Sequence, residues 1–201
     1  MLGSKDRMKY AKKIQLSANL LHLNKALVVV GRHGTWGGTD KYHVVRKYLP
    51  KKQVELVRDS LPEILKPHLM GVNYSEILLL APHIHTEEKT VINFYQHVNG
   101  EITSFWEGDI EQDDRWAADN GKGYINVNPD KIKVVESFTA KDGDVWILNT
   151  RQPHSVSMDS ESLSSGWQYA EQNNNARIIV QAYIDLPYEE AVKYFEEATT
   201  I

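Results

Sequence analysis

Three residues that could do metal chemistry stand at every second position of one apolar segment. Residues 77–94 read ILLLAPHIHTEEKTVINF and contain His83, His85 and Glu87. Because side chains of a strand alternate between its two faces, we expect these three to point the same way wherever the strand continues. Imidazole and carboxylate groups on a shared face can form one half of a non-haem iron site.

Composition gives little weight to the pair His85 and Glu87 taken alone. The chain has 8 His and 27 Asp plus Glu in 201 residues, so an acidic residue two places after some His is expected about once by chance. A His-X-His pair such as His83 and His85 is expected only about 0.3 times, which makes it less accidental. A second, distant segment is therefore needed to indicate a site.

That second segment is GDVWILNTRQPHSV, residues 143–156, which reads as a strand, a tight polar turn, and His154 opening the next strand. Arg177 enters another apolar strand 23 residues later. A buried guanidinium requires an anion, and its planar fork matches a carboxylate in two hydrogen bonds. If Arg177 lies on the strand beside His154, it could hold the far carboxylate of a dicarboxylate whose other end chelates a metal.

His85-Thr86-Glu87, then His154, then Arg177 resembles the His-X-Asp/Glu...His...Arg motif of the Fe(II)/2-oxoglutarate-dependent oxygenases. Members of this superfamily have a double-stranded β-helix, or jelly-roll, fold. The segment around His154 looks particularly like its hydroxylase branches, and the resemblance covers roughly residues 77–184. The chain departs from most members in carrying Glu87 where they carry Asp.

The resemblance implies an enzyme that uses Fe(II), 2-oxoglutarate and O2 to hydroxylate an unactivated C–H bond, with succinate and CO2 as co-products. It implies His85, Glu87 and His154 as iron ligands. Arg177 would pair with the distal carboxylate of 2-oxoglutarate. The prime substrate, whether a protein side chain, an amino acid or another metabolite, is not implied.

Asn93 and Tyr95 share one face of the strand that follows the metal-ligand segment. Their polar groups could hydrogen-bond 2-oxoglutarate, or the two side chains could serve cross-strand packing. Trp106, Trp146 and Phe105 are expected in the core rather than at a substrate surface.

A three-histidine site is the first alternative, because His83, His85 and His154 could form the metal centre of cupins, which have the same barrel. The interval from Gly143 to His154 fits the second cupin motif. The proline and glycine expected inside that motif are absent, and so is the acidic residue at the proper distance after His85. Such an enzyme would not need 2-oxoglutarate.

A non-enzymatic jelly-roll module that binds nucleic acid is the second alternative, because charge is unevenly spread. Residues 1–70 contain 14 Lys plus Arg against 5 Asp plus Glu, and residues 71–201 contain 9 against 22. A basic region of this kind can bind a polyanion. We favour the other explanation, a basic N-terminal layer that docks on an acidic barrel.

The pattern predicts a mainly β protein with flanking helices. A helix, or two short ones broken at Pro62, is expected over residues 50–69, and a C-terminal helix over residues 188–198. Short alternating or apolar runs separated by turns predict an antiparallel jelly-roll barrel. The expected strands are residues 26–30, 76–82, 90–97, 103–107, 124–127, 131–138, 144–149, 155–158 and 177–184.

Two loops are singled out by their composition. The glycine-rich segment of residues 31–38 is expected to be a turn, since the Gly-Lys-Ser/Thr of a phosphate-binding loop is absent. The acidic segment of residues 108–123, which includes Asp113, Asp114 and Arg115, is expected to overhang the substrate entrance or to be unstructured. Asn99-Gly100 predicts a hairpin between the strands on either side.

The chain is predicted to be a single domain over residues 1–201. It would consist of a basic N-terminal helix and strand layer (1–70), a jelly-roll core (75–186) and a C-terminal helix (187–201). The absence of cysteine excludes disulfides, thiolate zinc sites and cysteine nucleophiles. No apolar run approaches the length of a membrane span and no signal peptide is evident, so a soluble cytoplasmic protein is expected.

Overall fold

The structure is a computed structural model and describes residues 8–16, 32–39, 42–111, 124–158 and 176–198. Its strands are β1 (Ala11–Ile14), β2 (Arg32–Thr39), β3 (Tyr42–Tyr48), β4 (Leu69–His85), β5 (Thr90–His97), β6 (Ile102–Gly108), β7 (Tyr124–Asn126), β8 (Ile132–Thr139), β9 (Val145–Asn149), β10 (His154–Ser157) and β11 (Arg177–Ile184). Its helices are α1 (Lys51–Ser60), α3 (Tyr188–Ala198) and the 3-10 helices η3 (Glu63–His68) and η5 (Pro129–Lys131).

The strands follow the order β1-β9-β5-β11-β4-β10-β6-β8, and every pairing in this path is antiparallel. Strand β4 belongs to two sheets, since its first part pairs with β11 and its last part with β10. One sheet is therefore β1-β9-β5-β11-β4 and the other β4-β10-β6-β8. The chain passes from one sheet to the other between β5 and β6, between β8 and β9, between β9 and β10, and between β10 and β11. This is the arrangement of a jelly roll, so the predicted fold class is confirmed.

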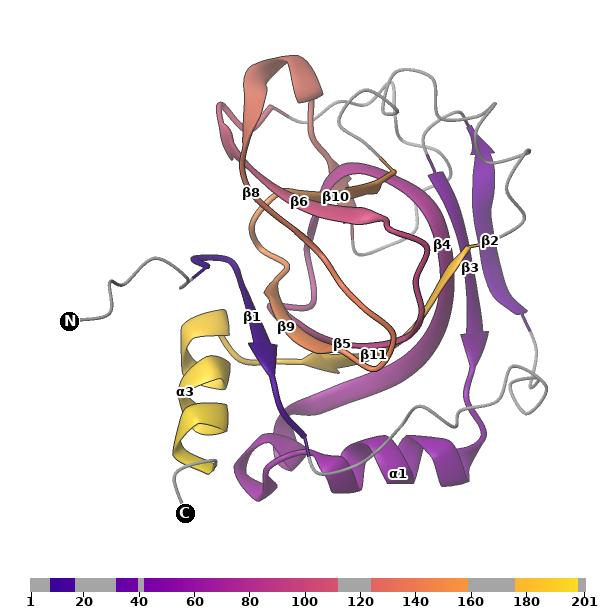
Figure 1. The fold of residues 1–201 in the computed structure, drawn as a ribbon, viewed down its shortest axis with the longest axis vertical. Helices are drawn as coiled ribbons and strands as arrows, with labels where there is room; N and C mark the ends of the chain where they lie inside the picture. The colour runs from indigo at the N-terminus through magenta and orange to yellow at the C-terminus, as the bar shows by residue number, and fades with distance from the viewer. Residues whose placement is uncertain (1–7, 17–31, 40–41, 112–123, 159–175, 199–201) are drawn as a thin grey trace.

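The long strand β4 curves along the barrel and joins the two sheets, because it belongs to both (Figure 1). Along its outer edge β3 pairs with it from Tyr42 opposite Leu80 to Tyr48 opposite Asn73, and β2 extends that edge. At its end β7 pairs with residues 83–85. The last residues of β4 are thereby held between β10 and β7.

Alternation along β11 separates an apolar outer face from a mixed inner face. Ile178, Val180, Ala182 and Ile184 join the core that α1 and α3 complete from outside the sheet (Figure 1). The alternate residues of β11 lie on the opposite face and are Arg177, Ile179, Gln181 and Tyr183. On that face Ile179 packs in a second core with Tyr95, Phe105 and Val156. The barrel interior is therefore lined by polar as well as apolar groups.

The helices lie where the apolar stripes predicted them. Pro50 is the N-cap of α1, and Val57 is its fully buried contact with the core. Pro62 is the N-cap of η3, so the break at this proline is confirmed. Helix α3 buries Tyr188, Ala191, Val192 and Phe195, and it is the predicted C-terminal helix.

Residues 11–14, for which no separate element is predicted, form a strand beside β9. Two local predictions are wrong. The glycine-rich segment expected as a turn forms β2, because a hairpin partner, β3, pairs with it. The Asn99-Gly100 turn exists, with Gly100 at φ 91°, but β5 and β6 do not pair across it, since β5 belongs to one sheet and β6 to the other.

Other expectations fall on parts of the chain outside the described residues. These are the strand at residues 26–30, the acidic loop from residue 112 to 123 with Asp113, Asp114 and Arg115, and the polar loop from residue 159 to 175. Of the described helices, none combines the length and the apolar character that crossing a bilayer requires.

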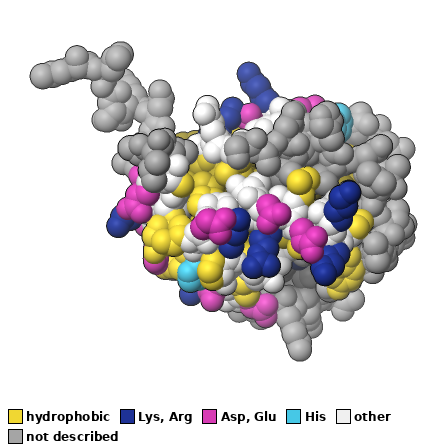
Figure 2. All heavy atoms as spheres, turned by 90° about the horizontal axis from the view of Figure 1, so that it is seen from below, with side chains coloured by type: hydrophobic (Ala, Val, Ile, Leu, Met, Phe, Trp, Pro, Cys, Tyr) yellow, Lys and Arg dark blue, Asp and Glu magenta, His cyan; other side chains and the backbone are white. Residues whose placement is uncertain are grey.

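The lysines around β1 contact acidic groups of the later chain. Lys9 pairs with Glu107 at 2.9 Å, Lys13 pairs with Asp144 at 2.6 Å, and Lys12 pairs with Glu196. On the face seen in Figure 2, the described Lys and Arg side chains are interspersed with Asp and Glu side chains rather than gathered in one basic patch. These contacts agree with a basic layer docked on an acidic barrel.

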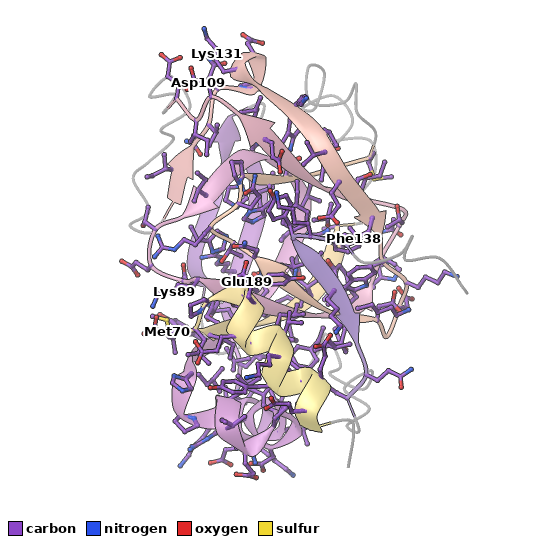
Figure 3. All side chains as sticks on the ribbon, turned by 90° about the vertical axis from the view of Figure 1, so that its left-hand side faces the viewer. Met70, Lys89, Asp109, Lys131, Phe138 and Glu189 are labelled. Atoms are coloured by element: carbon purple, nitrogen blue, oxygen red, sulfur yellow. The ribbon has the colours of Figure 1, made fainter. Side chains whose placement is uncertain are left out.

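A close backbone contact lies at one end of the molecule, where Asp109 and Lys131 are labelled in Figure 3, distant from Met70. The amide of Asp109 donates to the carbonyl of Lys131 at 3.1 Å. Gly108 precedes this contact with φ 148°, and a Cβ there would lie 2.4 Å from the Lys131 oxygen. Only glycine fits this approach without displacing the backbone.

Candidate metal centre

Three buried histidines meet where β4 and β10 pair. His83 and His85 lie at the end of β4, and His154 opens β10 directly opposite His83. Their exposed fractions are 1%, 3% and 6%. One ligand nitrogen from each ring lies within 4.8 Å of the other two. The strand period and the antiparallel register together bring these residues to one point.

Hydrogen bonds orient two of the three rings. The Nδ1 of His83 lies 2.9 Å from the carbonyl oxygen of Ala81, and the Nδ1 of His154 lies 2.9 Å from that of Gln152. A carbonyl only accepts, so each Nδ1 must carry the proton, which leaves the lone pair on Nε2. Histidines that bind metals commonly hold their other nitrogen in this way.

The three imidazoles are neutral at pH 7. Burial is the main cause that lowers the pKa of His83 and His85 well below 6.5, and the charge of a protonated neighbouring His154 would lower both further. Burial also lowers the pKa of His154 to about 4, an effect opposed by the Gln152 carbonyl and reinforced by the positive charge of Arg177. Neutral imidazole is the form that binds a metal.

The donor set fits a metal ion. Buried imidazoles suit Fe, Zn, Cu or Ni more than Mg or Ca, which prefer oxygen. Nitrogens bound to one ion at about 2.1 Å lie roughly 3 to 3.4 Å apart, so the rings would move closer together around it. Among the described residues, this is the group of His, Asp and Glu side chains that could hold a metal ion.

Glu87 and Glu88 differ in where they point. Strand β4 ends at His85, and Glu87 lies exposed in the bend that follows, outside the histidine group. The Oε2 of Glu88 lies 3.4 Å from the Nδ1 of His85, and only 17% of the Glu88 side chain is exposed. The alternation that joined Glu87 to His85 in the sequence does not continue past the strand end. The arrangement favours the alternative ligand His83.

Arg177 lies on β11 and is 3% exposed. Strand β11 does not pair with β10, so Arg177 is not on the strand beside His154. Both strands pair with the same edge of β4, the one opposite β3: β11 along residues 69–77 and β10 further along, at residues 80 and 83. Its Nη1 donates to the hydroxyl of Thr103 at 2.9 Å, and its guanidinium lies 5.4 Å from the ring centre of Tyr95. The buried Nε of Arg177 and the buried hydroxyl of Tyr95 make no hydrogen bond with any described residue. The positive charge of Arg177 contributes to the lowered pKa of His154.

Asn93 is buried in a hydrogen-bond network with Gln181 and Ser75. Its Oδ1 accepts from Gln181 at 3.2 Å, and Gln181 in turn accepts from Ser75 at 2.8 Å. A role in packing the strands together therefore accounts for Asn93, and a contact with 2-oxoglutarate stays a prediction. Phe105 and Trp106 are buried as expected, and Trp146 stacks on Phe138 with ring centres 3.9 Å apart.

The sequence analysis missed Thr103 and Glu88. Thr103 is one of many hydroxyl residues on strands, and only the pairing of β6 with β10 brings it near Arg177. Glu88 is adjacent to the singled-out Glu87, and the bend after β4 turns it back toward His85. Residues beyond a strand end no longer follow the strand period. The sequence does not mark the end of β4, so it gave no signal that Glu88 rather than Glu87 would face His85.

Comparisons with known proteins give distant matches to solved structures. No family model matches the chain. No curated protein matches it either. Escherichia coli ycfD matches 75% of this chain with a TM-score of 0.46 and 10% identity, and a hazelnut (Corylus avellana) vicilin matches 76% with 0.35 and 12%. An L-ribose isomerase of Geodermatophilus obscurus matches 71% with 0.33 and 12%.

This chain spans about a third of the first two matched chains and about three fifths of the third. The matches cover 35% of ycfD, 31% of the vicilin and 60% of the isomerase. At these TM-scores the likenesses carry no information on activity. The strand order and the side chains show a jelly roll with a three-histidine group that could bind a metal.

Proposed function

We propose that the protein is a metal-dependent oxygenase in which His83, His85 and His154 hold one Fe(II) ion. The observation that carries this proposal is the convergence of three buried imidazole nitrogens within 4.8 Å. Three imidazoles on one side of a metal leave other coordination positions for a co-substrate and oxygen. Bound Fe(II) would supply the redox activation of dioxygen that no side chain of this protein provides.

Arg177 and Tyr95 support a carboxylate-bearing co-substrate. A buried guanidinium with an unused N–H is costly unless an anion reaches it, and the neighbouring Tyr95 hydroxyl is a second unused donor. Thr103 fixes the guanidinium through Nη1 and leaves Nε for the ligand. A carboxylate would accept from Arg177 Nε and Tyr95 Oη together, within electrostatic reach of His154.

The co-substrate we propose is 2-oxoglutarate, whose second carboxylate would be the group held by Arg177. The prime substrate would then be hydroxylated, with succinate and CO2 released. The resemblance of residues 77–184 to the 2-oxoglutarate oxygenases favours this assignment, with His83 in place of Glu87 as the third ligand.

A cupin-type enzyme that uses no 2-oxoglutarate is the second candidate. The observation that favours it is the exclusion of Glu87 from the histidine group. In that enzyme Arg177 would hold a carboxylate of the substrate itself.

Turnover of 2-oxoglutarate separates the two candidates. Wild-type protein supplied with Fe(II), ascorbate, oxygen and 2-oxoglutarate should release succinate slowly even without a prime substrate, and His154→Ala should release none. Iron-loaded wild-type protein that consumes no 2-oxoglutarate would favour the second candidate. His97→Ala is the matched control, because His97 is a half-exposed histidine at the end of β5, outside the group.

A further inference from the structure

Glu88 is a shielded carboxylate that the proposed metal ligands do not include. Its Oε2 is buried and accepts no hydrogen bond from any described residue. The same oxygen lies 3.4 Å from the Nδ1 of His85. This distance exceeds a normal N–H···O hydrogen bond by only a few tenths of an ångström, so a small rotation of either side chain would close it.

Thr150 holds the backbone of Glu88 in this position. Its hydroxyl donates to the carbonyl of Glu88 at 3.0 Å, and its amide donates to the carbonyl of Lys89 at 3.3 Å. The carbonyl of Thr150 accepts from the amide of His85 at 3.0 Å. Thr150 is itself 1% exposed. One buried residue therefore connects both ends of the bend between His85 and Glu88, so their closeness does not depend on a loose loop.

The same ring nitrogen, Nδ1, faces an oxygen atom in all three histidines. A backbone carbonyl faces Nδ1 in His83 and in His154, and a carboxylate faces it in His85. A carboxylate makes the ring a more basic ligand than a carbonyl does, and its negative charge offsets part of the charge of a bound divalent ion. Three neutral imidazoles supply no such charge of their own.

We infer that Glu88 is a positioning residue for the metal centre, and that its carboxylate accepts the Nδ1–H of His85 and thereby keeps the lone pair of His85 on Nε2. The role of Glu88 in metal binding rests on the proposed function, in which the three histidines hold a metal ion. The hydrogen bond itself does not require a metal and can be measured without one.

The direct test compares Glu88→Gln and Glu88→Ala with Glu87→Gln and Glu87→Ala. The two positions are adjacent, so the matched variants make the same change with the carboxylate turned toward His85 or toward solvent. The tautomer of His85 is read in metal-free protein at pH 7.5 from long-range 15N–1H spectra of its imidazole nitrogens. Affinity is read from Zn2+ and Co2+ titrations against a competing chelator.

Wild-type protein and both Glu87 variants should hold His85 in the Nδ1–H tautomer and should bind the two metals within about threefold of each other. Glu88→Ala should give a mixture of tautomers and bind Zn2+ and Co2+ about 10- to 100-fold more weakly. Glu88→Gln keeps a neutral acceptor, so it should retain the tautomer while losing part of the affinity. The Co2+ absorption spectrum should keep its coordination type in every variant, since Glu88 is not a ligand.

An unchanged His85 tautomer in Glu88→Ala, with metal affinity equal to that of Glu87→Ala, would overturn the inference and leave the metal centre intact. A Co2+ spectrum that loses one ligand in both Glu88 variants would overturn it by making Glu88 a ligand. Wild-type protein that binds no metal would contradict the proposed function alone, because the tautomer measurement would still decide the role of Glu88. If Glu88→Ala unfolds, Glu88→Gln supplies the comparison.

Discussion

The three imidazoles, rather than two imidazoles and a carboxylate, define this site at the level of single residues. His83 and His154 sit opposite each other across a strand pair, and His85 is two residues along the same face. Glu87, which the sequence pattern favoured as a ligand, lies past the end of the strand and is exposed. Substitution of single ligands separates the two ligand sets.

His83→Ala should weaken Fe(II) or Co2+ binding by more than about 100-fold, because it removes one of three donors from a single ion. Glu87→Ala should leave the affinity within about threefold. The measurement is anaerobic titration with metal content determined after desalting, and His97→Ala serves as the unaffected histidine control. The opposite pattern, with metal kept by His83→Ala and lost by Glu87→Ala, would restore Glu87 as the ligand.

Arg177→Ala should affect the co-substrate and leave the metal in place. It removes a buried charged donor, so the 2-oxoglutarate concentration for half-maximal binding should rise roughly 10- to 100-fold. Isothermal titration of iron-loaded, anaerobic protein measures this value. Arg58→Ala, an exposed arginine on α1, is the control. Unchanged 2-oxoglutarate affinity in Arg177→Ala would exclude Arg177 from the co-substrate site.

At the level of elements, the sequence predicts the limits of strands better than their pairing partners, because strand limits depend on neighbouring residues and pairing depends on distant ones. The limits of β5 and β11 were predicted as the structure has them, because apolar runs between turn residues are local signals. The pairing partner of β5 was not predictable, since Asn99-Gly100 indicates a hairpin wherever it occurs. Strand β3 forms through pairing with β4, and β2 forms through pairing with β3. No local sequence pattern in either strand predicts these pairings.

The candidate metal centre was likewise predictable where local strand alternation applies, and not where it depends on a strand end or on strand order. His83 and His85 share a face for as long as β4 continues, and the strand does continue to His85. Glu87 fails the same argument because the period of two ends with the strand, a boundary that the sequence does not mark. Arg177 was identified from its type within an apolar strand, but its position on β11, which follows β10 along one edge of β4, depends on the pairing of distant strands.

Gly108 tests the packing of β6 against the segment that precedes β8. A Cβ at this position would lie 2.4 Å from the Lys131 carbonyl oxygen, and φ is 148°. Gly108→Ala should therefore lower the free energy of unfolding by more than about 2 kcal/mol. Gly71→Ala on β4, where a Cβ meets nothing within 4 Å, should change it by less than about 1 kcal/mol. Equal stabilities in urea denaturation would contradict the close contact.

At the level of the whole molecule, the buried histidines make folding of the metal-free protein sensitive to acid. The unfolded chain binds protons on these residues below pH 6.5, whereas the folded protein does not until the lower pKa values, about 4 for His154, are reached. Stability therefore increases with pH in this window. Between pH 6.5 and 5 the free energy of unfolding should fall by about 1.6 kcal/mol because of His154, and His83 and His85 should lower it further.

Urea denaturation of metal-free protein at several pH values measures this decrease. Saturating Zn2+ should reduce the slope, since a metal competes with protons for the same nitrogens. His97→Ala is the control, because this half-exposed residue lies outside the group of three buried histidines. A free energy of unfolding that stays constant from pH 6.5 to 5 would mean that the three histidines are not held neutral.

Anaerobic titration of the metal-free protein with Fe(II), followed by 2-oxoglutarate, tests the central claim most directly. We predict that one equivalent of iron binds, and that 2-oxoglutarate then produces the weak visible charge-transfer absorption of a keto acid chelated to iron. Iron bound without this absorption would contradict 2-oxoglutarate as the co-substrate. Protein that binds no iron would contradict the metal centre of His83, His85 and His154.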